Sequence, residues 1–125
     1  MFAFSGFGGR PARTATPKLT AADAVRMAQK GEITVIDVRG HDEVARSGKA
    51  KGAIHIPLMM IPNKADPRHP EFHPELSTDK PVAVYCASGA RSGMAAQMLE
   101  RFGFPAVHNI GGFGDWVSAG GPVSQ

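Results

Sequence analysis

The chain has 125 residues, of which 42% are hydrophobic and 20% are charged, values that predict one globular domain with a single buried core. Three of the 14 Lys and Arg residues, Arg10, Arg13 and Lys18, precede the first acidic residue, and the other 11 balance the 11 Asp and Glu residues. A nucleic-acid-binding surface is therefore not expected. No apolar run approaches the ~20 residues of a membrane-spanning helix, which argues against a membrane partner.

The start of the chain and its cysteine content indicate how the chain is organised and in which compartment it is located. Residues 1–16 mix Gly, Pro, Arg and Phe without periodicity, so we expect an irregular tail there and one domain over residues 17–125. The only cysteine, Cys86, cannot form a disulfide within the chain. Nothing therefore indicates an oxidising compartment, and we expect a cytoplasmic protein.

The domain is expected to begin with a helix, because Thr20 and Asp23 have the spacing of a capping box and Gly31 follows the apolar positions. Residues 33–39 are a nearly continuous apolar run with β-branched residues, typical of a strand in a parallel sheet covered on both faces. A short helix over residues 41–46 follows.

Strands and helices also alternate in the rest of the chain, which predicts an α/β domain with a mainly parallel sheet. His69 and His73 are four residues apart, but Pro70 between them argues against one helix that presents both to a metal, so no metal site is predicted. The remaining predicted elements are a strand over 53–57, a proline-rich loop over 62–81, a strand over 82–86, a helix over 94–101, a strand over 105–110 and a short helix with Trp116, after which ordered structure ends at 120–122.

Cys86 ends a predicted strand, and residues 87–92 are small or polar and lead into a helix. A loop that enters a helix directs unpaired N–H groups toward one point, which lowers the pKa of a thiol placed there below its usual ~8.5. Gly89 allows the tight turn and Arg91 adds a cation. The pattern predicts a reactive thiolate, although a lone cysteine at a strand end is otherwise most often a buried, inert residue.

Asp37 and Cys86 both end predicted strands, so we expect both at the same edge of the sheet, where α/β proteins bind ligands. Asp37 and Arg39 are expected to brace the reactive loop through hydrogen bonds or ion pairs. An ordinary strand-end charge is an equally good interpretation of Arg39. For Ser92, capping of the following helix is favoured over a hydrogen bond to the sulfur.

Four segments, taken together and in this order, resemble those of single-domain rhodaneses of the sulfurtransferase superfamily. The resemblance extends over residues 20–123 and implies a rhodanese-like three-layer α/β domain, in which helices flank a mainly parallel sheet on both faces. The segments are residues 36–39 (IDVR), residues 52–57 (GAIHIP), residues 86–92 (CASGARS) and residues 111–123, which contain Gly111-Gly112, Trp116 and Gly121-Pro122-Val123.

The resemblance implies that a Cys86 thiolate takes the outer sulfur of thiosulfate or of a persulfide donor, becomes a persulfide, and passes the sulfur to cyanide or to a thiol acceptor. It implies no metal and no organic cofactor, and it allows a sulfur-carrier protein as a further partner. The substrate-binding residues would be Ala87, Ser88, Gly89, Ala90, Arg91 and Ser92.

Two other interpretations remain open at this point. The related dual-specificity phosphatases and arsenate reductases have one more residue between the cysteine and the arginine than the C-x4-R of Cys86 and Arg91, which makes a phosphatase or arsenate reductase the less favoured enzyme. A binding or regulatory module could keep the fold without catalysis, but such modules often lose the cysteine. Arg91 is the only charged residue of the loop, so thiosulfate and persulfide donors are equally compatible with it.

Overall fold

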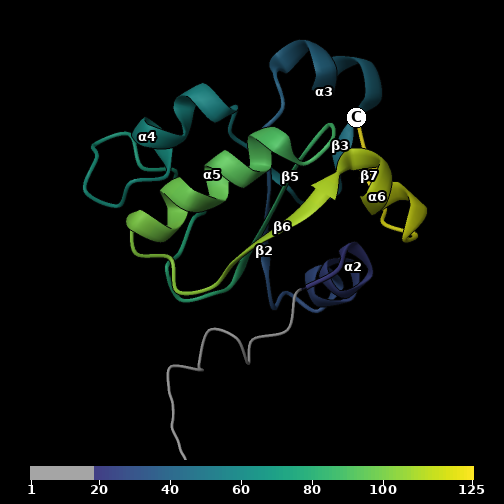
Figure 1. The fold of residues 1–125 in the computed structure, drawn as a ribbon, viewed down its shortest axis with the longest axis horizontal. Coiled ribbons are helices and arrows are strands. Elements are labelled where there is room, and N and C mark those ends of the chain that lie inside the picture. Colours follow the sequence, from purple (N-terminus) through teal and green to yellow (C-terminus); the bar gives the residue numbers. More distant parts are fainter. Residues whose placement is uncertain (1–18) are drawn as a thin grey trace, which may run out of the picture.

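Four parallel strands form the central sheet of the computed structural model, which describes residues 19–125 (Figure 1). In their order across the sheet they are β4 (Ile54–His55), β2 (Thr34–Asp37), β5 (Val82–Cys86) and β6 (Val107–Gly112). The strands that end on Asp37 and Cys86 are therefore the two central ones. Because the strands are parallel, both residues lie at the carboxyl edge of the sheet, as predicted.

Helices cover both faces of this sheet (Figure 1). One face is covered by α5 (Ala90–Arg101) and by the short α4 (Ile61–Lys64), which follows the 3-10 turn η1 (Leu58–Met60). The other face is covered by α2 (Ala21–Gln29) and α6 (Phe113–Ser118). The predicted α/β architecture, a mainly parallel sheet between two layers of helices, is confirmed.

All five residues of β5 are buried, and their side chains alternate between two apolar cores. Val84 and Cys86 belong to the core beneath α5, together with Leu99. Tyr85 belongs to the opposite core, where it lies with Trp116. This alternation directs the Cys86 side chain toward the helix that follows it in the sequence.

A second, small antiparallel sheet pairs β3 (Lys49–Ala50), which follows α3 (His41–Ser47) in the chain, with β7 (Val123–Ser124). The prediction that ordered structure ends at 120–122 is therefore wrong. Strands of two residues are too short to show an alternating pattern in the sequence. Trp116 connects this sheet to the core, because its indole N–H donates to the carbonyl of Pro122 at 2.8 Å.

Two predicted boundaries next to Cys86 need correction. The helix predicted over 94–101 begins at Ala90, because the first turn of α5 consists of small and polar residues that carry no apolar periodicity. The strand predicted over 105–110 instead occupies β6, 107–112, and includes both of its final glycines. The loop that carries the candidate site is therefore shorter than predicted.

The remaining differences lie farther from Cys86. The strand predicted over 33–39 is limited to 34–37, and the loop predicted over 62–81 begins only after Lys64, where α4 ends. The predicted tail, residues 1–16, lies outside the described residues. Within residues 19–125, no helix has both the length and the apolar character needed to cross a membrane.

Candidate functional site

The connection between β5 and α5 consists of residues 87–89 only. Gly89 is the N-cap of α5 and has a φ of 107°, a left-handed conformation that residues with a Cβ rarely adopt. Ala90, Arg91 and Ser92 form the first helical turn. The N–H groups of a first turn have no partner inside the helix, so they can serve a group at the end of β5.

The Cys86 sulfur is that group. Sγ accepts a hydrogen bond from the Gly89 N–H at 2.9 Å and lies 3.4 Å from the Ser92 hydroxyl. Burial raises the pKa of the Cys86 thiol, but hydrogen bonds from the Ser92 hydroxyl and from nearby backbone N–H groups outweigh it and lower the pKa to about 7. Those N–H groups belong to Ser92, Gly89 and Ser88. The arrangement favours a thiolate at neutral pH.

Arg91, the cation expected beside the sulfur, is paired with a carboxylate. Its Nη1 and Nη2 donate to the two oxygens of Glu43 in α3 at 2.7 and 2.9 Å. The Gly40 N–H also donates to Glu43, at 2.9 Å. Hydrogen bonds from Arg91 and Gly40 lower the pKa of Glu43 to about 2, so the pair is ionised at neutral pH. Backbone dipoles and the Ser92 hydroxyl, more than Arg91, therefore account for the low pKa of Cys86.

Asp37 and Arg39 form a buried ion pair one strand away from Cys86. Arg39 donates from its backbone N–H, Nε and Nη2 to the Asp37 carboxylate at 2.8–3.1 Å. It also donates to Ser47 Oγ and the Gly48 carbonyl at the end of α3, while Tyr85 Oη donates to Asp37 at 2.6 Å. In the described structure, the pair thus contacts the residue before Cys86 and the helix that carries Glu43, and hydrogen-bonds to no residue of 86–92.

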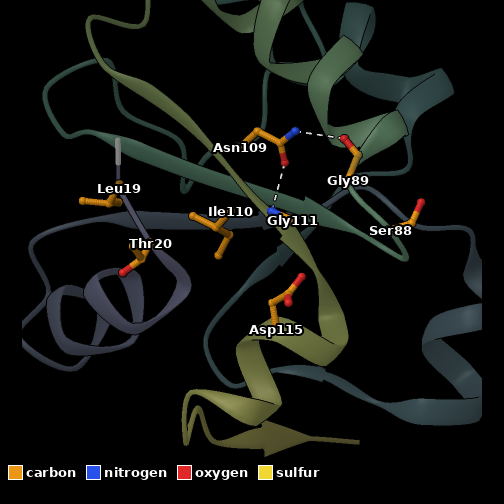
Figure 2. A pocket seen from close by; sticks show the side chains of 8 residues that line it. All are labelled: Leu19, Thr20, Ser88, Gly89, Asn109, Ile110, Gly111 and Asp115. Carbon is orange, nitrogen blue, oxygen red and sulfur yellow. Dashed lines mark hydrogen bonds between the residues drawn. The ribbon is translucent and has the colours of Figure 1, made fainter. Parts of the chain in front are cut away.

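Sequence reasoning missed Asn109 of β6. Its Nδ2 donates to the Gly89 carbonyl at 2.9 Å, and its Oδ1 accepts from the Gly111 N–H at 3.1 Å (Figure 2). The same Oδ1 accepts from the Ser92 hydroxyl at 2.7 Å. The prediction that Ser92 caps α5 is wrong, because the N-cap is Gly89 and Ser92 points to Asn109 and the sulfur. The available signal in the sequence was a polar residue inside the strand predicted over 105–110.

The end of β6 packs directly against the loop. The pairing of β5 with β6 is irregular between Val84 and Cys86, and Gly111 at this point has a φ of 99°. Gly112 is thereby aligned with Cys86. A Cβ on Gly112 would lie only 2.2 Å from the Ala87 carbonyl oxygen, so this position requires glycine.

An open cavity of about 470 Å³ adjoins the loop between β6, α6 and the start of α2 (Figure 2). Among the described residues that line it, Asp115 is the one with a charge, and its Oδ2 accepts from the Gly112 N–H at 2.7 Å. The described lining therefore offers no cation to an anionic ligand. It consists of Leu19, Thr20, Ser88, Gly89, Asn109, Ile110, Gly111 and Asp115. Over residues 19–125, no group of three or more His, Cys, Asp or Glu side chains is placed to hold a metal ion.

Comparison with known proteins decides the family. The model of the rhodanese-like domain matches residues 20–119, which contain the whole central sheet and the loop after Cys86. The chain belongs to the rhodanese-like domain family. The family and the fold implied by the four sequence segments are therefore confirmed.

Relatives of this rhodanese-like domain include proteins of known and unknown role. A protein of Allochromatium vinosum named sulfurtransferase is 31% identical over 99 residues, which cover 78% of this chain and 84% of that protein. The uncharacterized protein YqhL of Bacillus subtilis is 39% identical over 83 residues, which cover 66% of this chain but only 59% of YqhL. A solved structure from Rhodopseudomonas palustris, of a protein of unknown function called a possible tyrosine phosphatase, has a TM-score of 0.76 and 35% identity, and covers 90% of this chain and 88% of that one.

These similarities support the general sulfurtransferase class for this rhodanese-like domain. They assign no role to any individual residue of the chain. The roles of Cys86 and of the loop residues therefore rest on the geometry described above.

Proposed function

We propose that this rhodanese-like domain is a sulfurtransferase that carries a sulfane sulfur on Cys86. The thiolate attacks the outer sulfur of thiosulfate or of a persulfide donor, a Cys86 S–S bond forms, and the donor leaves as sulfite or as a thiolate. Cyanide or an acceptor thiolate then attacks the outer sulfur of the Cys86 persulfide. The Cys86 S–S bond breaks, thiocyanate or the acceptor persulfide is released, and the Cys86 thiolate is restored.

The observation that carries this proposal is the set of hydrogen-bond donors on one sulfur. The Gly89 N–H and the Ser92 hydroxyl lie 2.9 and 3.4 Å from Sγ, and the pKa of Cys86 is about 7. A thiol whose pKa lies near the working pH combines a large thiolate fraction with good nucleophilicity. The same donors stabilise Cys86 each time the sulfur regains its negative charge as a leaving group.

The charges around the loop support a persulfide donor as much as thiosulfate. Arg91 is already paired with Glu43, and the cavity beside the loop presents the carboxylate of Asp115. A dianion such as thiosulfate therefore meets no unpaired cation among the described lining residues. The persulfide group of a small thiol, or of a sulfur-carrier protein, carries at most one negative charge next to the transferred sulfur, whereas thiosulfate carries two.

The proposal is tested by offering the protein thiosulfate and, separately, glutathione persulfide. We expect mass spectrometry to show one added sulfur atom on the peptide that contains Cys86, and thiocyanate to appear when cyanide is added. Cys86→Ser must abolish both signals. If neither donor loads the wild-type protein, the proposal is wrong. If Cys86→Ser keeps the full biological activity in cells, the protein is a binding or regulatory module and not a sulfurtransferase.

The similarity to the possible tyrosine phosphatase makes phosphate-ester hydrolysis a second candidate. Two features argue against it. Only four residues separate Cys86 from Arg91, and both terminal nitrogens of Arg91 already bond to Glu43 instead of facing a free oxyanion site. Turnover of a small aryl phosphate by the wild type, lost in Cys86→Ser, would favour this second function over sulfur transfer.

A further inference from the structure

The Ser92 hydroxyl carries one proton and lies near three acceptors, of which the Gly111 carbonyl is the most distant at 3.5 Å. Its oxygen is 2.7 Å from Asn109 Oδ1 and 3.4 Å from Cys86 Sγ. One hydroxyl proton makes one good hydrogen bond at a time. The two shorter contacts therefore compete for that proton. Each has a normal length for its acceptor, because sulfur is a larger atom than oxygen and accepts hydrogen bonds at longer distances.

The state of the sulfur decides which contact is favourable. When Cys86 is a thiol, its S–H can donate to Ser92 Oγ while the hydroxyl donates to Asn109, so that all three groups form one chain. When Cys86 is a thiolate, it has no proton to give and attracts the hydroxyl proton to itself. Asn109 Oδ1 is then still satisfied, because the Gly111 N–H also donates to it at 3.1 Å. Rotation of one hydroxyl thus leaves no buried polar atom unpaired.

We propose that Asn109 is a positioning residue that competes with the Cys86 sulfur for the hydroxyl proton of Ser92. The role of Asn109 in sulfur transfer rests on the proposed function. The hydroxyl donates to Sγ in the free thiolate and returns to Asn109 once the persulfide forms, because the negative charge then lies on the outer sulfur. Asn109 accordingly keeps the thiolate less stabilised, and more nucleophilic, than the loop donors alone would make it.

The charged side chains near the loop have partners other than Ser92 and Asn109. Arg91 of α5 is paired with Glu43 of α3, and Asp37 and Arg39 pair with each other. Asp115 of α6 accepts from the Gly112 N–H. A neutral replacement of Asn109 leaves all of these charges in place. A shift in the pKa of Cys86 that occurs only when Ser92 is present therefore reports on the hydroxyl proton of Ser92.

The experiment is a double-mutant cycle of Asn109→Leu and Ser92→Ala. The pKa of Cys86 is measured in each protein from the pH dependence of its alkylation by iodoacetamide. We expect Ser92→Ala to raise this pKa. We expect Asn109→Leu to lower it by about half a pH unit, or about threefold in the thiolate-to-thiol ratio, and to leave it unchanged in the S92A background.

Asn109 also donates to the Gly89 carbonyl, and a residue that only clamped the loop would shift the pKa equally with and without Ser92. Such an equal shift, or a rise in the pKa on Asn109→Leu alone, would overturn the inference. Asn63→Leu, the same change at an exposed position of α4, is the matched control and should have no effect. Asn109→Val, with a side chain suited to a strand, replaces N109L if that variant does not fold. Alkylation needs no sulfur donor, so the outcome is independent of whether sulfur transfer is found.

Discussion

The Arg91 guanidinium and the Glu43 carboxylate form a two-point ion pair that joins the first turn of α5 to α3, with N–O distances of 2.7 and 2.9 Å. The pair fixes one side of the loop after Cys86. It also compensates the only cation of that loop, so the charge is not free to attract an anionic donor. Removal of the Glu43 charge separates these two effects.

Glu43→Gln should lower the KM for thiosulfate by about two- to fivefold, because an exposed charge that loses its partner contributes up to about 1 kcal/mol to attraction of a dianion. The turnover number should change little. Steady-state thiocyanate formation measures both constants. Asp42→Asn removes a neighbouring, exposed carboxylate of the same helix and serves as the control for net charge. An equal decrease in KM in both variants would show that Arg91 is not the cation responsible.

The same pair should contribute stability that depends on pH. The pKa of Glu43 is lowered from 4.5 to about 2 in the folded protein. The ionised Glu43 therefore stabilises the folded state at pH values above its unfolded-state pKa, and this stabilisation is lost as the pH falls through its folded-state pKa. The difference in unfolding free energy between wild type and Glu43→Gln should be about 1 kcal/mol or less at neutral pH, because the pair is partly exposed. Urea unfolding at several pH values should show that difference vanish between about 4.5 and 2. A difference that persists at the acid end would contradict this assignment.

Alkylation of Cys86 by iodoacetamide should accelerate as the pH rises and level off above a midpoint of about 7. The reason is that the thiolate, not the thiol, is the nucleophile. The rate of persulfide formation with thiosulfate should follow the same midpoint. A midpoint at or above the ~8.5 of a free cysteine would mean that the loop donors do not stabilise the charged sulfur.

The parts of the fold and site that depend on neighbouring residues could be predicted from the sequence. The apolar run that ends on Cys86 is buried on both faces of β5, and the small residues after it do form a turn into a helix. Gly89 takes the left-handed conformation that such a turn needs. These features are local, so residue type and spacing carry them.

The partners of the loop could not be predicted, because they come from distant segments. Glu43 reaches Arg91 across 48 residues, and nothing in the short helix that carries it distinguishes it from Asp42. Asn109 reaches Gly89 and Ser92 because β6 is in register with β5 so that Asn109 is aligned with Val84, and this register joins two strands that are distant in the sequence.

Arg39→Met should destabilise the protein by about 3–5 kcal/mol, because it leaves the Asp37 carboxylate buried without its partner. Guanidinium-chloride unfolding measures the loss, and Arg46→Met, at an exposed position of α3, should cost less than about 1 kcal/mol. The sequence left open whether Arg39 braces the site or is an ordinary strand-end charge. A small loss, equal to that of Arg46→Met, would support the ordinary interpretation.

Gly112→Ala should reduce sulfur transfer at least tenfold, because the new methyl group would overlap the Ala87 carbonyl, whose oxygen lies 2.2 Å from the Cβ position. Backbone must move to relieve the overlap, and the backbone that moves is the loop that holds Cys86. Overpacking of this kind also costs about 1–3 kcal/mol of stability. Gly114→Ala, two residues later in α6, meets no atom within 4 Å, so it should keep full activity and gain about 0.5–1 kcal/mol from its helical position. Thermal unfolding and thiocyanate formation, measured on both variants, separate the two effects. Equal activity of the two variants would show that the end of β6 does not hold the loop in its reactive shape.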